Sequence, residues 1–325
     1  MILAPDSLTL NAPPRPLKRR RWIRRLTITG AIVVVGWLAS SLLVAWLLTH
    51  RLGRSFAEPV PVIKNVNVED VRLPTSDGQQ IGGWFVRPTQ HQAIFLLLHG
   101  NGDSRRSNAA LMQSLAEQGY GVLAISLRAH GDSTGSLNDI GWSARYDAIA
   151  AVDFVRRIYP AEPLIICGVS LGAATAVYAS DELKDRVSAY VLDSLYLDLD
   201  SAVRNRLHLF LPPVADWIAY RGLRLWAPCF LTQSIDQYSP MQHLQSIPST
   251  TPVTFLCGSL DDRALPCEGE QMFNSIRSHA RLIRFEGAGH GNLFLRDRTK
   301  YLQILTQAAD DASAHHAPTL PRPPT

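Results

Sequence analysis

The hydrophobic positions of the chain form one long apolar run and, after it, many short ones. Residues 26–49 are 24 consecutive residues without a charge. As a helix rising 1.5 Å per residue they would span about 36 Å, enough to cross a ~30 Å hydrocarbon core. Trp22 and Trp46 stand near its ends, where aromatic rings favour the membrane interface. The pattern predicts a transmembrane helix over 26–49. A cleaved signal peptide, the main alternative, has a shorter apolar region and a small-residue cleavage site that is not evident here.

The remainder alternates short apolar runs with helical patterns. Residues 66–87 predict a β-hairpin, because the Asp77-Gly78 pair is a strong turn signal between β-rich runs. Six further strands are expected at 93–98, 122–127, 164–167, 189–192, 253–257 and 281–285. Helices are expected near 105–118, 141–158, 171–181, 267–279 and after residue 290. Strands alternating with helices predict an α/β fold, with a mostly parallel twisted sheet and helices on both faces.

These patterns divide the chain into five parts. We expect a basic arm over 1–25, the transmembrane helix over 26–49, a linker over 50–64, a catalytic domain over 65–308 and a disordered tail over 309–325. Residues 196–250 interrupt the alternation and are rich in Leu, Trp and Pro, which predicts a helical cap inserted above the sheet. The cap residues Trp217, Tyr220 and Trp226 either line an apolar substrate pocket or pack the cap onto the sheet.

Charge is concentrated before the apolar run. Nine of the 32 Lys and Arg but one of the 28 Asp and Glu lie before residue 55, so the rest of the chain carries four more acids than bases. This balance gives nucleic-acid binding little support. The bases between Lys18 and Arg25 predict a cytoplasmic N-terminus by the positive-inside rule. We therefore expect a single-pass membrane protein with its catalytic domain on the opposite, periplasmic or extracytoplasmic, side.

A nucleophile motif follows the third of the six strands. Residues Gly168 to Gly172 fit G-x-S-x-G, with the strand Leu-Ile-Ile-Cys before them and a small-residue helical stretch after them. A serine at a sharp strand-to-helix turn is held with its hydroxyl exposed above the sheet, and flanking glycines allow the close approach of neighbouring chain. Ser170 is therefore the predicted nucleophile.

Serine needs a base and the base an orienting carboxylate. His290, in a glycine-rich loop after the last strand, is the predicted base. Asp261 and Asp262 both follow the strand before it, and the order Ser…Asp…His fits this motif. We favour Asp261 as the acid and keep Asp262 as the alternative. The backbone N–H groups of Leu171 and Asn101 are the predicted oxyanion donors, while His99 is expected to be structural.

With these motifs the chain resembles the α/β-hydrolase superfamily over about residues 65–308. The matching segments are the Asp-Gly hairpin, His99-Gly-Asn-Gly, 126–133 (SLRAHGDS), Gly-Val-Ser-Leu-Gly, 191–194 (VLDS), 258–262 (GSLDD) and 287–290 (GAGH). Within that superfamily it resembles the membrane-anchored α/β-hydrolase-domain type of serine hydrolase. Relatives commonly carry Gly-x-x-Asp-x-x-x-Pro, and Pro266 fits that spacing from Asp262 but is one residue late from Asp261.

The predicted function is hydrolysis of an ester, thioester or related acyl bond in a small-molecule or lipid substrate, by way of an acyl-enzyme. No cofactor or metal is expected, because H-E-x-x-H, C-x-x-C and P-loop motifs are absent from the sequence. A serine peptidase of the same fold is one alternative. A catalytically inactive, membrane-tethered binding protein is another. The sequence identifies neither the acyl group nor any protein partner, and it leaves open whether Cys229 and Cys267 pair.

Overall fold

The computed structural model describes residues 17–51 and 56–316. One eight-stranded sheet, in the order β1-β2-β4-β3-β5-β6-β7-β8, forms its centre. β1 and β2 form an antiparallel hairpin, β2 pairs antiparallel with β4, and all later pairings are parallel. The strands are β1 (Glu69–Pro74), β2 (Gln80–Val86), β3 (Ile94–Leu98), β4 (Gly121–Ile125), β5 (Leu164–Val169), β6 (Ala189–Asp193), β7 (Val253–Gly258) and β8 (Ala280–Phe285).

Helices cover both faces of the sheet. α3 (Arg145–Ile158), α4 (Leu171–Leu183) and α8 (Pro266–Ser275) contribute to the apolar core on one face. α2 (Ala109–Glu117) and α10 (Arg298–His316) contribute to the core on the other. Shorter helices are η1 (Arg105–Asn108), η2 (Lys184–Arg186), η3 (Ile235–Gln237), α7 (Pro240–His243), η4 (Leu244–Ser246) and α9 (Leu293–Arg296). The strands between these layers are continuously apolar because both of their faces are buried: every residue of β3 is buried.

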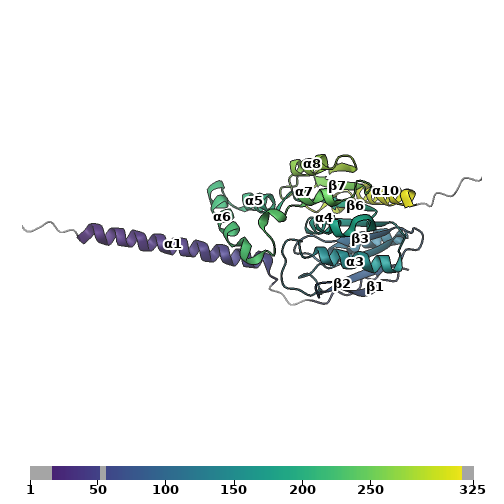
Figure 1. Ribbon diagram of the computed structural model, residues 1–325, viewed down its shortest axis with the longest axis horizontal. Coiled ribbons are helices and arrows are strands. Elements are labelled where there is room, and N and C mark those ends of the chain that lie inside the picture. Colours follow the sequence, from purple (N-terminus) through teal and green to yellow (C-terminus); the bar gives the residue numbers. More distant parts are fainter. Residues whose placement is uncertain (1–16, 52–55, 317–325) are drawn as a thin grey trace, which may run out of the picture.

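α1 (Leu17–Thr49) extends away from this domain as one long helix (Figure 1). Its stretch from Arg20 to Thr49 is the one described helix that is long and apolar enough to cross a membrane. The helix starts nine residues earlier than the predicted span, in the basic stretch, because Lys and Arg are good helix formers and nothing there stops a helix. Residues 1–16 of the predicted basic arm lie outside the described residues. This helix supports a membrane anchor.

The predicted cap consists of a helical hairpin, α5 (Leu199–Phe210) and α6 (Pro213–Phe230), followed by η3, α7 and η4. Figure 1 shows the hairpin beside the C-terminal half of α1, away from the centre of the sheet. The prediction of a disordered tail from residue 309 is wrong for residues 309–316. α10 continues to His316, because Ala308, Ala309 and Ala312 are buried against the domain. Residues 317–325 lie outside the described residues.

The segment predicted as a linker is docked on the domain at two points. The N–H of Arg51 donates to the carbonyl of Ser136 at 2.9 Å, and its guanidinium donates to the carbonyl of Gly131 at 3.1 Å. Glu58 is 4% exposed and its carboxylate lies 2.9 Å from the guanidinium of Arg105. The chain that leaves α1 is therefore fixed to the domain on both sides of residues 52–55, which lie outside the described residues.

Candidate active site

Ser170 occupies the turn between β5 and α4. Its φ of 50° and ψ of −105° are unusual for a residue with a side chain, and its N–H donates to the carbonyl of Asp193 at 2.8 Å. Both motif glycines are required for close approach. A Cβ on Gly172 would lie 2.4 Å from the carbonyl oxygen of Leu98, and one on Gly168 would lie 2.5 Å from the amide of Ala173. The local sequence thus allows a strained turn that presents one hydroxyl at the carboxyl edge of the sheet.

The structure brings Ser170, His290 and Asp261 together. The Ser170 Oγ lies 2.9 Å from His290 Nε2, across 120 residues of sequence. His290 Nδ1 lies 2.9 and 3.0 Å from the two carboxylate oxygens of Asp261. Asp262 is exposed, and none of the contacts of His290 in the described chain involves it. This is the hydrogen-bond order that base-assisted attack by a serine requires.

The carboxylate of Asp261 is held in its charged form. Burial alone would raise its pKa, but the hydrogen bond and charge of His290 and the N–H groups of Ala264 and Arg263 outweigh burial and hold the pKa below its usual value. Each of those two N–H groups donates to Asp261 Oδ1 at 2.9 Å. A charged Asp261 next to Nδ1 favours the tautomer that leaves a lone pair on Nε2, facing Ser170.

Two histidines shape the loop that carries the predicted oxyanion donor Asn101. His99 is fully buried, its Nδ1 lies 2.8 Å from the carbonyl of Gly100, and its Nε2 accepts the N–H of Leu127 at 2.9 Å. Burial lowers the pKa of His99 to about 3, so it stays neutral. His130 Nε2 accepts the N–H of Gly102 at 3.3 Å. His99 therefore acts on loop structure, while the second histidine is a loop support that sequence reasoning missed.

The two predicted oxyanion donors belong to segments that lie next to Ser170. Leu171 is the first residue of α4, where helical N–H groups lack partners within the helix and the helix dipole favours negative charge. Asn101 lines the same cavity as Ser170 and His290, and its side-chain Oδ1 accepts a hydrogen bond from Asn138 at 2.7 Å. The loop is close to the elbow: a Cβ on Gly100 would lie 4.0 Å from the Cβ of Ser170.

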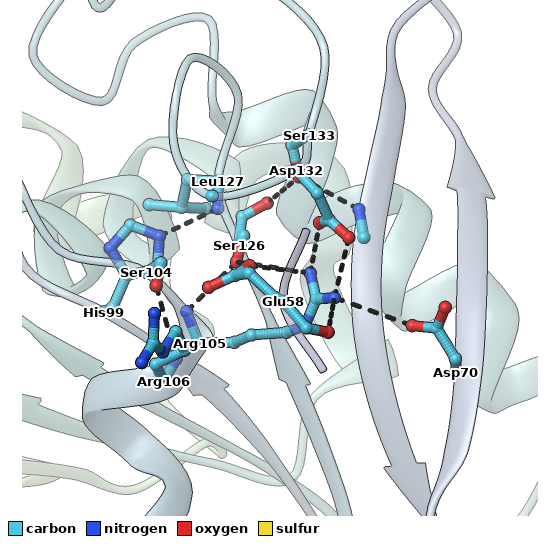
Figure 2. A network of polar contacts seen from close by, with 12 residues as sticks. Glu58, Asp70, His99, Ser104, Arg105, Arg106, Ser126, Leu127, Asp132 and Ser133 are labelled. Carbon is cyan, nitrogen blue, oxygen red and sulfur yellow. Dashed lines mark hydrogen bonds and ion pairs between the residues drawn. The ribbon is translucent and has the colours of Figure 1, made fainter. Parts of the chain in front are cut away.

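Behind this loop lies a buried polar network that the sequence did not predict (Figure 2). The fully buried Arg105 donates to both carboxylate oxygens of Asp132, at 2.5 and 2.9 Å, and pairs with Glu58. Its own N–H donates to the Ser126 hydroxyl at 3.1 Å, and that hydroxyl donates to Glu58. The network joins the segment after α1, the start of η1 and the turn after β4, so it fixes the base of the loop that carries Asn101 to the domain.

A second missed feature supports the His290 loop. The N–H of Gly291 donates to the hydroxyl of Ser194 at 3.0 Å, and that hydroxyl donates to Asp193 Oδ1 at 2.8 Å. Burial raises the pKa of Asp193 to about 7. The sequence signal for this feature was the Asp193-Ser194 pair at the end of β6, at the same edge of the sheet as Ser170.

The site opens into a cavity of about 380 Å³. Besides Ser170 and His290 it is lined by two arginines, Arg206 from α5 and Arg263 from the loop after Asp261. In the described chain the hydrogen bond of the Arg206 guanidinium goes to the carbonyl of Ala202 in its own helix, and no carboxylate lies within 4 Å of it. The cap aromatics Trp217, Tyr220 and Trp226 do not line this cavity.

Metal and thiol chemistry receive no further support from side-chain placement. Within the described ranges no three His, Cys, Asp or Glu side chains are grouped as metal ligands would be. The four cysteines, all of them described, are free, and the two exposed ones, Cys229 and Cys267, are unpaired.

Comparisons with known proteins agree with this architecture. A family model described as alpha/beta hydrolase fold matches residues 93–219. The uncharacterized protein Rv2307c of Mycobacterium tuberculosis is 27% identical over 283 residues, which cover 85% of this chain and 92% of that protein. The mouse lysophosphatidylserine lipase ABHD12 is 31% identical over 120 residues, 35% of this chain and 30% of the lipase.

A solved structure, the esterase PF2001 of Pyrococcus furiosus, has a TM-score of 0.63 and 21% sequence identity, and the match covers 80% of this chain and 99% of the esterase. At 21% sequence identity the similarity to this esterase is evidence for the fold alone. The sheet order, the matched family model and these similarities together show that the chain has the α/β-hydrolase fold.

Proposed function

We propose that this chain is a membrane-anchored serine hydrolase that cleaves an ester, thioester or related acyl bond. The observation that carries the proposal is the 2.9 Å contact between Ser170 Oγ and His290 Nε2, with Asp261 on the far side of the imidazole. In this mechanism Ser170 attacks the acyl carbonyl while His290 takes its proton. His290 then protonates the leaving group, and water hydrolyses the acyl-enzyme by the same route in reverse.

The developing oxyanion is stabilised by the N–H groups of Leu171 and Asn101. Each preorganised donor of this kind contributes about 3–4 kcal/mol to the transition state. Asp261 holds the imidazole tautomer and stabilises the imidazolium that forms. The mechanism needs no cofactor or metal.

Two features support the substrate class. The unpaired Arg206 and the neighbouring Arg263 in the cavity favour an acyl compound that also carries a carboxylate or phosphate, because a guanidinium binds such groups in bidentate fashion. The partial likeness to a lysophosphatidylserine lipase supports an amphiphilic ester. A peptidase of this fold remains the second candidate.

The apolar helix α1 supports attachment to a membrane. Arg20, Arg21, Arg24 and Arg25 precede its apolar part, and by the positive-inside rule they favour a cytoplasmic N-terminus. The catalytic domain would then lie on the periplasmic or extracytoplasmic side.

A fluorophosphonate probe on the detergent-solubilised full chain tests the proposal. We expect labelling of the wild type and of Ser278→Ala, which changes an exposed serine, and no labelling of Ser170→Ala. Hydrolysis of p-nitrophenyl esters of increasing chain length, beside a peptide substrate, then separates esterase from peptidase. Labelling that persists in Ser170→Ala would show that another residue is the reactive nucleophile and would overturn the role of Ser170. A wild type that neither labels nor hydrolyses would favour an inactive binding protein.

A further inference from the structure

The cap hairpin is packed against the helix that anchors the protein. The indole of Trp37 donates to the carbonyl of Ile218 in α6 at 3.2 Å. In the other direction the indole of Trp226 donates to the carbonyl of Leu38 at 3.1 Å and to the Ser41 hydroxyl at 3.2 Å. These contacts join α6 to the middle of α1, well before α1 reaches the catalytic domain.

The two helices stay together up to the end of α1. A Cβ on Gly222 would lie 2.6 Å from the Cβ of Ser41, so the absence of a side chain at 222 allows the backbones to approach closely. At the end of α1 the ring of His50 makes an edge contact with Phe230, with centroids 5.7 Å apart. Contacts therefore advance along both helices in the same direction, and α6 follows α1 for about 18–20 Å.

This packing restricts where the hairpin lies if α1 crosses a bilayer. Only residues 26–36 separate the basic stretch from the first α6 contact at Trp37. Eleven helical residues span about 16 Å, roughly half of a ~30 Å hydrocarbon core. The second half of the crossing must then use the part of α1 that is packed on α6. The beginning of α6 consequently lies at the depth of the acyl chains.

The outer surface of the hairpin has the composition that such a position requires. Its exposed large apolar side chains are Leu209, Phe210, Val214, Trp217, Ile218 and Leu225. Phe210 and Val214, on either side of the turn between α5 and α6, are the most exposed at 77% and 74%. An apolar patch of this kind is unusual on a surface in contact with water, and its member Ile218 accepts the indole N–H of Trp37 from α1 at its carbonyl.

Two ion pairs join the helices of the hairpin, His208 with Asp216 and Arg224 with Asp200. Within α6 the guanidinium of Arg221 lies over the ring of Trp217, and Arg206 faces the candidate active-site cavity instead of the outer surface. The turn also has few backbone donors. Pro212 and Pro213 carry no N–H, and the N–H groups of Ala215 and Asp216 donate to the Pro212 carbonyl at 2.9 and 3.0 Å. Satisfied backbone and paired charges are the condition for placing irregular chain in lipid.

We propose that the α5–α6 hairpin is a second membrane-embedded element, which dips into the leaflet on the domain's side without crossing it and contacts lipid acyl chains through the tip around Phe210 and Val214. α5 also carries Arg206 to the cavity that holds Ser170. The same hairpin thus contacts lipid with its outer surface and lines the candidate active site with its inner one. The proposal depends on α1 as the anchor and not on the hydrolytic chemistry.

Site-directed spin labelling of the full chain in phospholipid vesicles tests this placement. The exposed Cys229 and Cys267 are first replaced by serine, while Cys167 and Cys257 are buried. Single labels are then placed by Phe210→Cys and Val214→Cys. Val35→Cys, on the exposed surface of α1, is the lipid reference. Gln307→Cys is the water reference, because α10 lies at the far end of the domain (Figure 1).

We expect the ratio of collisions with oxygen to collisions with a water-soluble nickel chelate to be several-fold higher at 210 and 214 than at 307, and close to that at 35. Nickel-accessible labels at 210 and 214 beside a lipid-like label at 35 would overturn the proposal. So would a water-like label at 35, because α1 would then not cross. Spin–spin broadening between equal labels at 210 would assign this surface to a second copy of the chain and would also overturn it.

Discussion

Asp261 and Asp262 are neighbours in sequence, but only one is placed to act on His290. Asp261 is 3% exposed, holds both carboxylate oxygens within 3.0 Å of Nδ1, and accepts two backbone N–H groups. Asp262 faces solvent. Strand position alone brought both aspartates to the same edge of the sheet, and the spacing to Pro266 pointed to the other residue. The direction of one side chain decides between them, and the backbone of this loop sets that direction.

Exchange of each aspartate for asparagine separates the two assignments. Asp261→Asn should lower kcat by about 10³–10⁴, because the amide no longer favours the productive imidazole tautomer. Asp262→Asn should leave kcat within about twofold of wild type, as is usual for an exposed side chain that contacts none of the reacting groups. Steady-state hydrolysis of one p-nitrophenyl ester measures both. A large loss in Asp262→Asn with little loss in Asp261→Asn would reverse the assignment.

Arg206 and Arg204 both lie in α5, and only Arg206 lines the candidate active-site cavity. Arg206→Gln should reduce the preference for a phosphate-bearing ester over its uncharged analogue by at least about tenfold, since a hydrogen bond to a charged group contributes ~1.5–3 kcal/mol. Arg204→Gln is the matched control, because Arg204 lies over the ring of Tyr220 outside the cavity. The readout is the ratio of kcat/KM values for the two esters. An equal ratio in wild type and Arg206→Gln would exclude this arginine from anion binding.

The strands of the domain could be predicted because a strand that is buried on both faces needs a short, continuously apolar sequence, and helical patterns separate these runs. β3, β5 and β7 are short apolar runs, and each predicted site residue lies within five residues after the end of a strand. The packing of α6 on α1 produces no comparable pattern in the sequence. Its contacts are two indole N–H groups and a glycine, far apart in sequence. Of the cap tryptophans, Trp226 contacts α1 instead of lining the candidate active site. The Arg105 network was missed for the same reason, since the members described above come from three separate segments.

The junction of β5 and α4 depends on the close approach of β3. Gly172→Ala places a methyl group 2.4 Å from the backbone oxygen of Leu98, which has no side-chain freedom to move away. We expect a loss of about 1–3 kcal/mol in the free energy of unfolding. Gly100→Ala, whose added Cβ would meet its nearest neighbour at 3.7 Å, should cost less. Thermal unfolding in detergent measures both, and equal melting temperatures for the two variants would contradict this account of the elbow.

Stability of the folded chain should respond to acid through His99. Its folded-state pKa of about 3 lies below the unfolded value of ~6.5, so the unfolded chain binds a proton first as pH falls. The stabilising contribution is complete above pH 6.5 and is lost between that pH and about 3. His99→Gln should therefore reduce the slope of the unfolding free energy between pH 6 and 4 by about 1.4 kcal/mol per pH unit.

The exposed His91, exchanged in the same way, is the control for this measurement. Denaturant unfolding across the pH range gives both slopes. An unchanged slope in His99→Gln would mean that the imidazole is charged in the folded protein, which would conflict with its acceptance of the Leu127 N–H.

The docking of Arg51 and Glu58 on the domain has a kinetic consequence. An enzyme on a slack tether can sample dissolved molecules throughout the volume around its attachment point. Here the chain is held on both sides of residues 52–55, so under the proposed membrane anchoring the candidate active-site cavity would stay at one height above the lipid surface. For a substrate that resides in the bilayer, turnover should then follow its mole fraction in the plane and not its amount per litre, because the surface sets the effective concentration. Inert phospholipid added at constant total substrate would slow such an enzyme by surface dilution alone.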